Sequence, residues 1–394
     1  MRCIRMEYSF SEKYNGITGS AIRQIFSLLS DPEIISFAGG NPSPATFPRE
    51  QMADISKEVL LEMGDVLLQY GDTAGRKSMI ETVTELFAEE GTKPEPGEVI
   101  ILSGSSQGID LMAKAMLNEG DRVLVESPTF LGALQTMRLY GGTPVGVETD
   151  GEGIVIADLE RKIKENTPKY LYIIPTFQNP SGRTTSGERR QAIVETCAKH
   201  GVMVLEDDPY GALRYEGKPQ PSMKSFDKYG SVVKLMSFSK TISPGMRVGA
   251  AYGPAEVIRK FNMGKQGQDC HTSNLTQEMV ARYIARGYYK EGIDAKCSYY
   301  AKKAKLMYEL AKKFLPEGTN VIKAEGGMFI WAELPEQYNA TEAFKTAVEK
   351  KVAYVPGTHF YAEGGHHNTL RLNFTMVDED KITKGMETLG TVFR

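Results

Sequence analysis

The sequence predicts an α/β fold, in which a mostly parallel sheet is covered by helices on both faces and is followed by a smaller α+β domain. The first observation is that short apolar runs alternate with helix-like segments from about residue 98 to residue 236. The second is that this alternation stops after about residue 276, where a long helical region runs to about Phe314. The third is the length of 394 residues, which is too great for one compact core.

Five apolar runs in the first region are predicted to be strands, and the segments between several of them are predicted to be helices. The expected strands are Val99–Leu102, Arg122–Glu126, Tyr170–Ile174, Val202–Glu206 and Val232–Met236. The expected helices include Gly108–Leu117 and Ser186–His200. The carboxyl edge of such a sheet is where α/β proteins bind ligands, so the residues that end these strands are candidate site residues.

The two ends of the chain are expected to combine into the smaller domain. Strands are predicted near Met328–Glu333 and Thr369–Phe374, with a final helix from about Glu379. Residues 16–30 have apolar side chains at roughly helical spacing, and the Gly/Pro-rich stretch over 39–44 must be a loop. We therefore expect an N-terminal arm over residues 1–45, a large domain over 46–285 and a small domain over 286–394.

The composition argues against several classes of protein. The net charge of −3 gives no electrostatic reason to bind nucleic acid or an anionic membrane. No apolar run approaches the ~20 residues of a membrane span, and the N-terminus lacks the apolar stretch of a signal peptide. The four cysteines are scattered, and the five histidines are too few and too dispersed for a metal cluster. A reduced, cytoplasmic compartment and no metal site are therefore expected.

The most informative stretch is Ser237-Phe238-Ser239-Lys240, which is followed seven residues later by Arg247. A lysine amine beside two hydroxyls and a guanidinium suits a cofactor with an aldehyde at one end and a phosphate at the other. Pyridoxal phosphate (PLP) is such a cofactor, because the lysine can form a Schiff base with its aldehyde. Ser237, Ser239 and Arg247 can hold the phosphate. The motif alone also fits a solvated surface lysine, so other segments must support it.

The segment after the first predicted strand supports a phosphate site. Ser103-Gly104-Ser105-Ser106-Gln107-Gly108 opens a helix, where free backbone amides and small side chains let an anion approach. Ser105 and Ser106 are the candidate ligands. An ordinary turn between strand and helix is the alternative. The segment has neither a Walker lysine nor a full GxGxxG, which makes a nucleotide less expected.

Three further strand ends complete a set suited to an aromatic cofactor ring. Phe130 can lie flat on the ring, and Asn179 can donate from its amide. Asp207 can pair with a protonated pyridine nitrogen, while the hydroxyl of Tyr210 can reach the phenolate oxygen O3′ of the ring. Asp207 is preferred to Asp208 because of its spacing to Tyr210 and because neighbouring strand residues point to opposite faces. Phe130 could instead be a core residue, Asn179 could belong to a tight turn, and the acidic residues 207 and 208 could be helix caps.

These segments give the chain a resemblance, over nearly its whole length, to the fold-type I PLP-dependent aminotransferases of the aspartate aminotransferase superfamily. The most specific segments are Gln178–Gly182, Asp207–Tyr210 and Ser237–Lys240 with Arg247. The resemblance implies a mostly parallel seven-stranded sheet in the large domain. Arg371 matches the arginine that binds the substrate α-carboxylate in this family. Tyr70 matches a tyrosine that reaches the phosphate of the neighbouring subunit, which implies a homodimer with shared active sites.

Within the superfamily the chain most resembles the 2-aminoadipate and kynurenine aminotransferase branch. The carrying segments are Ile35–Pro42, Phe47-Pro48 and Ser243–Arg247. In related lysine-biosynthesis enzymes, residues that match Ser20 and Arg23 contact the substrate side chain. Ser106 and Phe130 depart from the glutamine and tyrosine of many relatives, which leaves the exact substrate open.

The resemblance implies an aminotransferase that moves an amino group between an α-amino acid and a 2-oxo acid. Glutamate and 2-oxoglutarate are the expected shared pair, and 2-aminoadipate or an aromatic or branched amino acid is the expected partner. Lys240 is expected to hold PLP and to move the substrate proton, with Asp207 and Tyr210 as the other catalytic residues. The substrate is expected to contact Arg371, Asn179, the Gly40 backbone, Ser20 and Arg23.

Two other functions stay open at this point. A PLP-dependent β-lyase or decarboxylase would use the same cofactor, although Arg371 and the Asp207–Tyr210 segment favour transamination. A ligand-sensing regulator could carry the same fold as an effector domain. Such regulators have an added basic DNA-binding domain, and no helix-turn-helix fits the ~30 residues before the Gly39-Gly40 loop.

Overall fold

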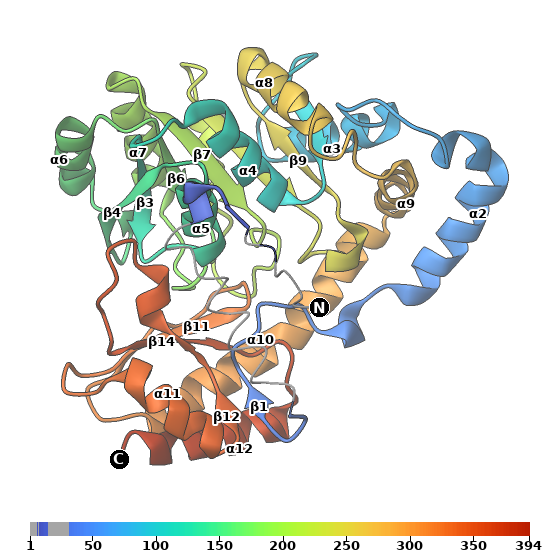
Figure 1. Ribbon diagram of the computed structural model, residues 1–394. Coiled ribbons are helices and arrows are strands. Elements are labelled where there is room, and N and C mark those ends of the chain that lie inside the picture. The colour runs from blue at the N-terminus through green and yellow to red at the C-terminus, as the bar shows by residue number, and fades with distance from the viewer. Residues whose placement is uncertain (1–5, 7, 15–30) are drawn as a thin grey trace, which may run out of the picture.

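The computed structural model describes residue 6, residues 8–14 and residues 31–394 of the chain. Ser20, Arg23 and the helix expected over residues 16–30 lie outside the described residues. Figure 1 shows a large sheet with its helices in the upper part of the molecule and a smaller sheet below it. The long helix α10 (Tyr288–Phe314) runs from one part to the other, as Figure 1 shows in orange.

The large sheet has eight strands in the order β2-β9-β8-β7-β6-β3-β4-β5. Their bounds are β2 (Val99–Leu102), β3 (Arg122–Ser127), β4 (Thr143–Asp150), β5 (Gly153–Ile154), β6 (Tyr170–Ile173), β7 (Met203–Asp208), β8 (Val232–Ser237) and β9 (Gly249–Tyr252). Strands β8, β7, β6, β3 and β4 pair in parallel, whereas β9 and β5 pair antiparallel with their neighbours. The five predicted strands and the mostly parallel sheet are confirmed. The sheet has one strand more than the seven expected, because the two-residue β5 extends its edge beside β4.

Helices cover both faces of the large sheet because its strands are apolar at successive positions. In β2, Ile100 and Leu102 pack into the cluster that contains residues of α4, α5 and α8, while Val99 and Ile101 pack into the cluster with α2, α3 and α9. A further cluster places α6 and α7 against β3, β6 and β7. The bounds of these helices are α2 (Arg49–Leu67), α3 (Lys77–Glu89), α4 (Ser105–Met116), α5 (Leu131–Leu139), α6 (Ile156–Asn166), α7 (Gly187–Lys199), α8 (Ala255–Gln266) and α9 (Asn274–Ala285).

The smaller part is built on an antiparallel sheet in the order β10-β11-β14-β13. Its elements are β10 (Asn320–Val321), β11 (Phe329–Glu333), β12 (Val352–Ala353), β13 (Val355–Pro356), β14 (Thr369–Asn373), α11 (Ala340–Glu349) and α12 (Glu379–Val392). Strand β1 (Ile35–Ser36) pairs in parallel with β12, so an N-terminal segment does join this part, as expected. The domain boundaries near residues 45 and 285 stay predictions.

The helical region expected from residue 276 to Phe314 is two helices rather than one. Helix α9 ends at Ala285 and α10 begins at Tyr288. Gly287 lies between them with φ of 79°, a left-handed conformation that interrupts the helix and that glycine adopts without strain. Among the described residues, none of the helices combines the length and apolarity that a membrane span requires.

Candidate active site

A cavity of about 280 Å³ lies where the carboxyl ends of the large sheet's strands face the small sheet. It gathers twelve of the fifteen site residues that the sequence predicted. They are Gly40, Ser105, Ser106, Phe130, Asn179, Asp207, Tyr210, Ser237, Ser239, Lys240, Arg247 and Arg371. Arg371 comes from β14 of the small sheet, and the others come from the large part and the Gly39-Gly40 loop. The cavity is also lined by five residues that were not predicted as site residues: Asn41, Gly104, Ile174, Pro209 and Pro244.

Lys240 lies in the segment that follows β8, and its amine is held in the cavity. The Nζ atom donates a hydrogen bond to the carbonyl oxygen of Gly40 at 2.8 Å. Burial, together with the nearby charges of Arg371 and Arg247, lowers the pKa of Lys240 to about 8. A larger fraction of this amine is therefore neutral near pH 7 than of an exposed lysine, and the neutral amine is the nucleophilic form.

Asp207 lies at the end of β7 and is 3% exposed. The Tyr172 hydroxyl donates to its Oδ2 atom at 2.9 Å, while Oδ1 has no hydrogen-bond partner in the described part of the chain. Burial raises the pKa of this carboxyl to about 7. A buried carboxylate oxygen without a donor costs ~1–3 kcal/mol, so the site favours a ligand that brings a donor to Oδ1. A protonated ring nitrogen is such a donor.

Tyr172 is a residue that the sequence analysis missed. The strand that contains Tyr172 was predicted correctly, but Tyr172 was treated as one of its apolar residues and was given no role in the site. Strands β6 and β7 pair in parallel with Tyr172 opposite Leu205, so Asp207 lies two residues further along β7 on the same face. A tyrosine within a predicted central strand was the available signal, since a buried hydroxyl needs a partner.

Arg371 is 1% exposed and packs between two aromatic rings. Its guanidinium carbon lies 4.3 Å from the ring centre of Phe329 and 5.1 Å from that of Phe360. Its Nη1 atom donates to Asn179 Oδ1 and its Nη2 atom to the Ala38 carbonyl, both at 2.8 Å, while Nε has no partner among residues 6, 8–14 and 31–394. Burial lowers its pKa to about 10, which leaves the group charged near pH 7.

The polar partners of Arg371 are neutral, so its charge is not balanced by a direct contact with an acid among the described residues. A buried cation without such a partner is a strong site for a carboxylate ligand. The bond to Arg371 occupies the oxygen of the Asn179 amide, which leaves its NH₂ end to donate. Tyr210, which also lines the cavity, is buried, and this burial raises its pKa above the ordinary value.

The start of α4 and Arg247 form one end of the cavity. Gly104 precedes the helix with φ of 90°, and Ser105 and Ser106 provide its first, unpaired amides. Arg247 Nη2 donates to the Ser103 carbonyl at 2.6 Å, and its Nη1 atom lies 3.4 Å from Ser239 Oγ. A Cβ atom at Gly104 would lie 2.7 Å from Arg247 Nη2, so glycine is required for this close approach. Amides, hydroxyls and a guanidinium together suit a phosphate.

Phe130 and Ile174 line the same cavity from the ends of neighbouring strands. Phe130 immediately precedes α5, and the second residue of that helix is Gly132. A Cβ atom at Gly132 would lie 2.6 Å from the Phe130 ring, so the absence of a side chain there makes room for the ring. Both residues offer apolar surface to a flat ligand.

Tyr70 is placed away from this cavity. Its side chain is 83% exposed and lines a separate cavity of about 910 Å³. The preceding residue is fixed by a hydrogen bond of 2.8 Å from Asn274 Nδ2 to the Gln69 carbonyl. Within one chain, Tyr70 therefore does not reach the site around Lys240.

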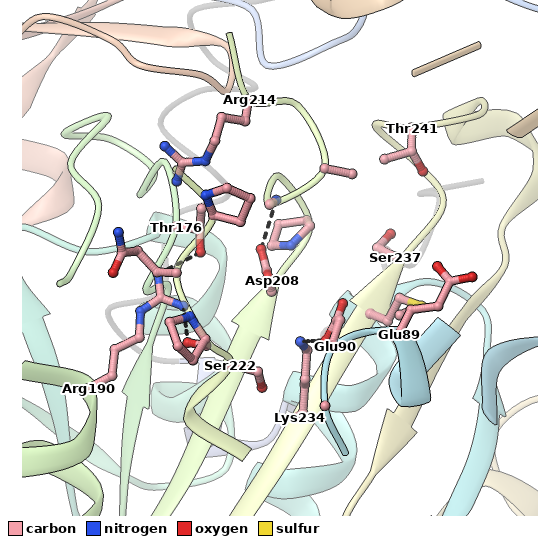
Figure 2. Close-up of a pocket in the computed structure, with 18 of the residues that line it drawn as sticks. Glu89, Glu90, Thr176, Arg190, Asp208, Arg214, Ser222, Lys234, Ser237 and Thr241 are labelled. Atoms are coloured by element: carbon pink, nitrogen blue, oxygen red, sulfur yellow. Dashed lines mark hydrogen bonds and ion pairs between the residues drawn. The ribbon is translucent and has the colours of Figure 1, made fainter. Parts of the chain in front are cut away.

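Asp208 faces a different cavity from Asp207. It lines a cavity of about 570 Å³, and Figure 2 shows it there with Lys234, Arg190 and Arg214. Its Oδ1 atom accepts a hydrogen bond from the Gly211 amide at 2.8 Å, so it caps the following turn. The two neighbouring carboxylates thus occupy opposite faces of β7, as the alternation of strand residues requires.

The family model described as Aminotransferase class I and II matches residues 32–389, and the chain belongs to this family. The aromatic-amino-acid aminotransferase 1 of Thermococcus litoralis is 38% identical to it, with 98% of this chain and 94% of the relative covered. The protein is a PLP-dependent aminotransferase of fold type I, and the resemblance inferred from its motifs is confirmed.

Two solved structures show the same fold at similar identity. A kynurenine aminotransferase from Pyrococcus horikoshii, in complex with PMP, is 39% identical with a TM-score of 0.94, and 98% and 96% of the two chains are covered. The α-aminoadipate aminotransferase of Thermus thermophilus, complexed with N-(5′-phosphopyridoxyl)-L-leucine, is 37% identical with a TM-score of 0.90. The coverage in this second pair is 98% of this chain and 97% of the other. The unpartnered Oδ1 atom of Asp207 and the open cradle beside Gly104 fit the cofactor of this family.

The two neighbouring aspartates allow a direct test of which carboxylate serves the cofactor. We predict that Asp207→Asn lowers kcat on the order of 10²–10³-fold, because it removes a buried charge opposite the ring nitrogen. Asp208→Asn should change kcat less than about threefold, since an asparagine oxygen can still accept from the Gly211 amide. Steady-state kinetics at saturating PLP measures both, and a larger loss in the Asp208 variant would contradict the assignment.

Proposed function

We propose that this enzyme transfers the amino group of an α-amino acid with a large side chain to 2-oxoglutarate, with glutamate as the other product. The candidate donors are 2-aminoadipate and aromatic or branched amino acids. The observation that carries the proposal is that the amine of Lys240 and the guanidinium of Arg371 face one small cavity. That pair suits an α-amino acid, whose amine and carboxylate are attached to the same carbon.

We assign the cofactor's phosphate to the amides and hydroxyls of Ser105 and Ser106, with Ser237, Ser239 and Arg247. Phe130 would support one face of the ring, and Asp207 Oδ1 would accept a hydrogen bond from the protonated ring nitrogen. Asn179 and Tyr210 donate to the phenolate oxygen. When bound, PLP supplies an aldehyde that captures amines and a ring that withdraws electrons from the substrate Cα.

Lys240 is assigned two tasks in this proposal. Its Nζ atom would hold the cofactor's aldehyde, and the same amine, when free, would accept the proton from the substrate Cα. The lowered pKa of about 8 supports this second task, because a base must be partly unprotonated near neutral pH. Gly40, whose carbonyl holds the Lys240 amine, contributes backbone to the substrate side of the cavity.

Arg371 is assigned to the substrate α-carboxylate, with Asn179 beside it. Its position between Phe329 and Phe360 restricts the guanidinium and excludes water from it, which strengthens a charge-assisted hydrogen bond. The side-chain pocket is assigned to the N-terminal arm, with Ser20 and Arg23 as its polar residues. The named activities of the relatives, on aromatic amino acids, kynurenine and α-aminoadipate, support a donor with a large side chain.

A panel of donors tests the proposal and the role of Arg23 together. We predict that 2-aminoadipate, phenylalanine and leucine include at least one efficient donor to 2-oxoglutarate. Arg23→Ala should cost 2-aminoadipate about 1.5–3 kcal/mol in kcat/KM, because a charge-assisted pair with its distal carboxylate is lost. Phenylalanine and leucine should lose little.

Lys13→Ala is the matched control, because it removes an exposed cation from the same arm. It should leave all three values of kcat/KM unchanged. An equal loss for all donors in Arg23→Ala would assign Arg23 a structural role. Absence of transamination with every donor would contradict the proposed substrate class.

We also propose that the active form is a homodimer with shared sites in the cytoplasm. Large apolar side chains are exposed on and after α2, including Leu61 at 79% and Leu68 at 75%, and Tyr70 follows them. An exposed apolar stretch of this kind favours burial against another chain. A second copy is the occupant that would also bring Tyr70 to a phosphate. The cytoplasmic location rests on the scattered cysteines.

Mixed dimers test the shared site. A dimer of one Lys240→Ala chain and one Tyr70→Phe chain contains one site with both native groups only if Tyr70 acts on the neighbouring subunit. We therefore expect subunit exchange between the two variants to restore activity at limiting PLP, because the hydroxyl contributes ~1–3 kcal/mol to phosphate binding. Proven exchange without a gain over the separate variants would place Tyr70 outside the site.

A further inference from the structure

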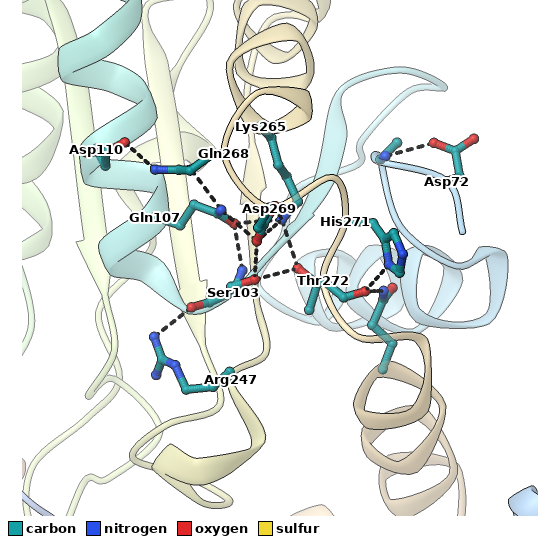
Figure 3. Close-up of polar contacts among 12 residues, drawn as sticks. Asp72, Ser103, Gln107, Asp110, Arg247, Lys265, Gln268, Asp269, His271 and Thr272 are labelled. Atoms are coloured by element: carbon teal, nitrogen blue, oxygen red, sulfur yellow. Dashed lines mark hydrogen bonds and ion pairs between the residues drawn. The ribbon is translucent and has the colours of Figure 1, made fainter. Parts of the chain in front are cut away.

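A partly buried polar network adjoins the phosphate end of the cavity, and its lysine and aspartate are not among the residues assigned to the cofactor or the substrate. Figure 3 shows its centre, where Lys265 of α8 meets Asp269 in the loop after that helix. The Lys265 amine is 2.8 Å from Oδ1 and 2.9 Å from Oδ2 of Asp269. Lys265 is fully buried, whereas the Asp269 side chain is 29% exposed, so the pair joins a buried amine to a carboxylate that reaches solvent.

The remaining hydrogen bonds of the pair join two distant segments of the chain. The Lys265 amine also donates to Gln107 Oε1 at 2.8 Å and to Thr272 Oγ1 at 3.1 Å. Asp269 Oδ2 accepts from Gln107 Nε2 at 2.9 Å and from Ser103 Oγ at 2.7 Å. Hydrogen bonds from Lys265, Ser103 and Gln107 outweigh the effect of burial and lower the pKa of Asp269. The carboxylate is therefore ionised near pH 7.

Ser103 is the residue on which these bonds converge. Its amide donates to Gln107 Oε1 at 2.8 Å, its hydroxyl donates to Asp269, and its carbonyl accepts from Arg247 at 2.6 Å. All its polar groups are thus held in place. The next residue is Gly104, where the backbone turns into α4, so fixing Ser103 fixes the first amides of the helix.

We propose that Lys265, Asp269 and Gln107 are positioning residues for the phosphate cradle, and that they act through Ser103 on the amides of 104–106 and on Arg247. The proposal rests on the assignment of the cofactor's phosphate to that cradle. A carboxylate held close to an anion site would weaken binding if it were unpaired. The amine of Lys265 neutralises it, so Asp269 can accept from Ser103 and Gln107 without repelling the phosphate.

Breaking this ion pair is expected to weaken the binding of PLP rather than to slow turnover of the loaded enzyme. In Lys265→Met, Asp269 loses its counter-charge and the cradle loses its support, so the Kd for PLP should rise on the order of 10–100-fold. Pyridoxal, which has the same aldehyde and ring but no phosphate, should bind the variant within about twofold of its wild-type Kd. Absorbance titration of the apoprotein with each compound measures both constants.

The control is Lys224→Met, which also removes a largely buried lysine from a lysine–aspartate pair. The Lys224 amine lies 2.8 Å from the Asp227 carboxylate. Neither residue lines the cavity around Lys240. This variant should bind PLP and pyridoxal as the wild type does, even where its Tm falls. A selective loss of PLP binding in the control as well would overturn the proposal.

A double variant separates positioning from stability. Lys265→Met/Asp269→Leu replaces both charges by apolar groups, which often restores stability lost in a single variant. Its Tm should recover towards the wild-type value, while its Kd for PLP stays raised. Recovery of PLP affinity with Tm, or an equal loss for PLP and pyridoxal in Lys265→Met, would overturn the proposal. If the wild type bound pyridoxal as tightly as PLP, the assignment of the cofactor's phosphate to this cradle would be wrong.

Discussion

The burial of Lys240, Asp207 and Arg371 around one cavity is the constraint on which the rest of this site depends. Burial, with the nearby charges of Arg371 and Arg247, lowers the pKa of Lys240 to about 8, and burial raises the pKa of Asp207 to about 7. Two of these groups lack a full set of partners, because Asp207 Oδ1 and Arg371 Nε have none among the described residues. Burying these polar groups costs the folded protein free energy of desolvation. A cationic ring nitrogen beside Asp207 and a carboxylate beside Arg371 would offset that cost.

The architecture explains how these groups come together although they are far apart in the sequence. Parallel strands bring Asp207 and the segment after Ser237 to one edge of the large sheet. Arg371 belongs to the small sheet and reaches this edge through its bond to Asn179, 192 residues away. The pairing of β1 with β12 brings the Gly39-Gly40 loop to the same place, where Gly40 meets Lys240. The site therefore exists only when both parts are packed together.

Much of this could be predicted from the sequence, because strand ends with polar residues mark the edge of a parallel sheet. Five of the eight strands of the large sheet, β2, β3, β6, β7 and β8, and twelve residues of the cavity were found in this way. Strand β9 was missed because Gly249–Tyr252 is short and alanine-rich, and the break at Gly287 because apolar spacing continues across it. The partner of Tyr172 depends on strand pairing, and the roles of Lys265 and Asp269 depend on contacts more than 150 residues away, so none of these contacts could be read from the sequence.

Chemical trapping of the bound cofactor tests the central claim most directly. Borohydride reduction of the PLP-loaded protein fixes the cofactor to the lysine that holds it, and peptide mass mapping identifies that lysine. Three buried lysines serve as internal controls for labelling elsewhere in the protein: Lys234, Lys265 and Lys303. The account predicts a phosphopyridoxyl group on Lys240 alone, and its loss from the Lys240→Ala protein. A label on any of the other buried lysines, or an unchanged label in Lys240→Ala, would contradict it.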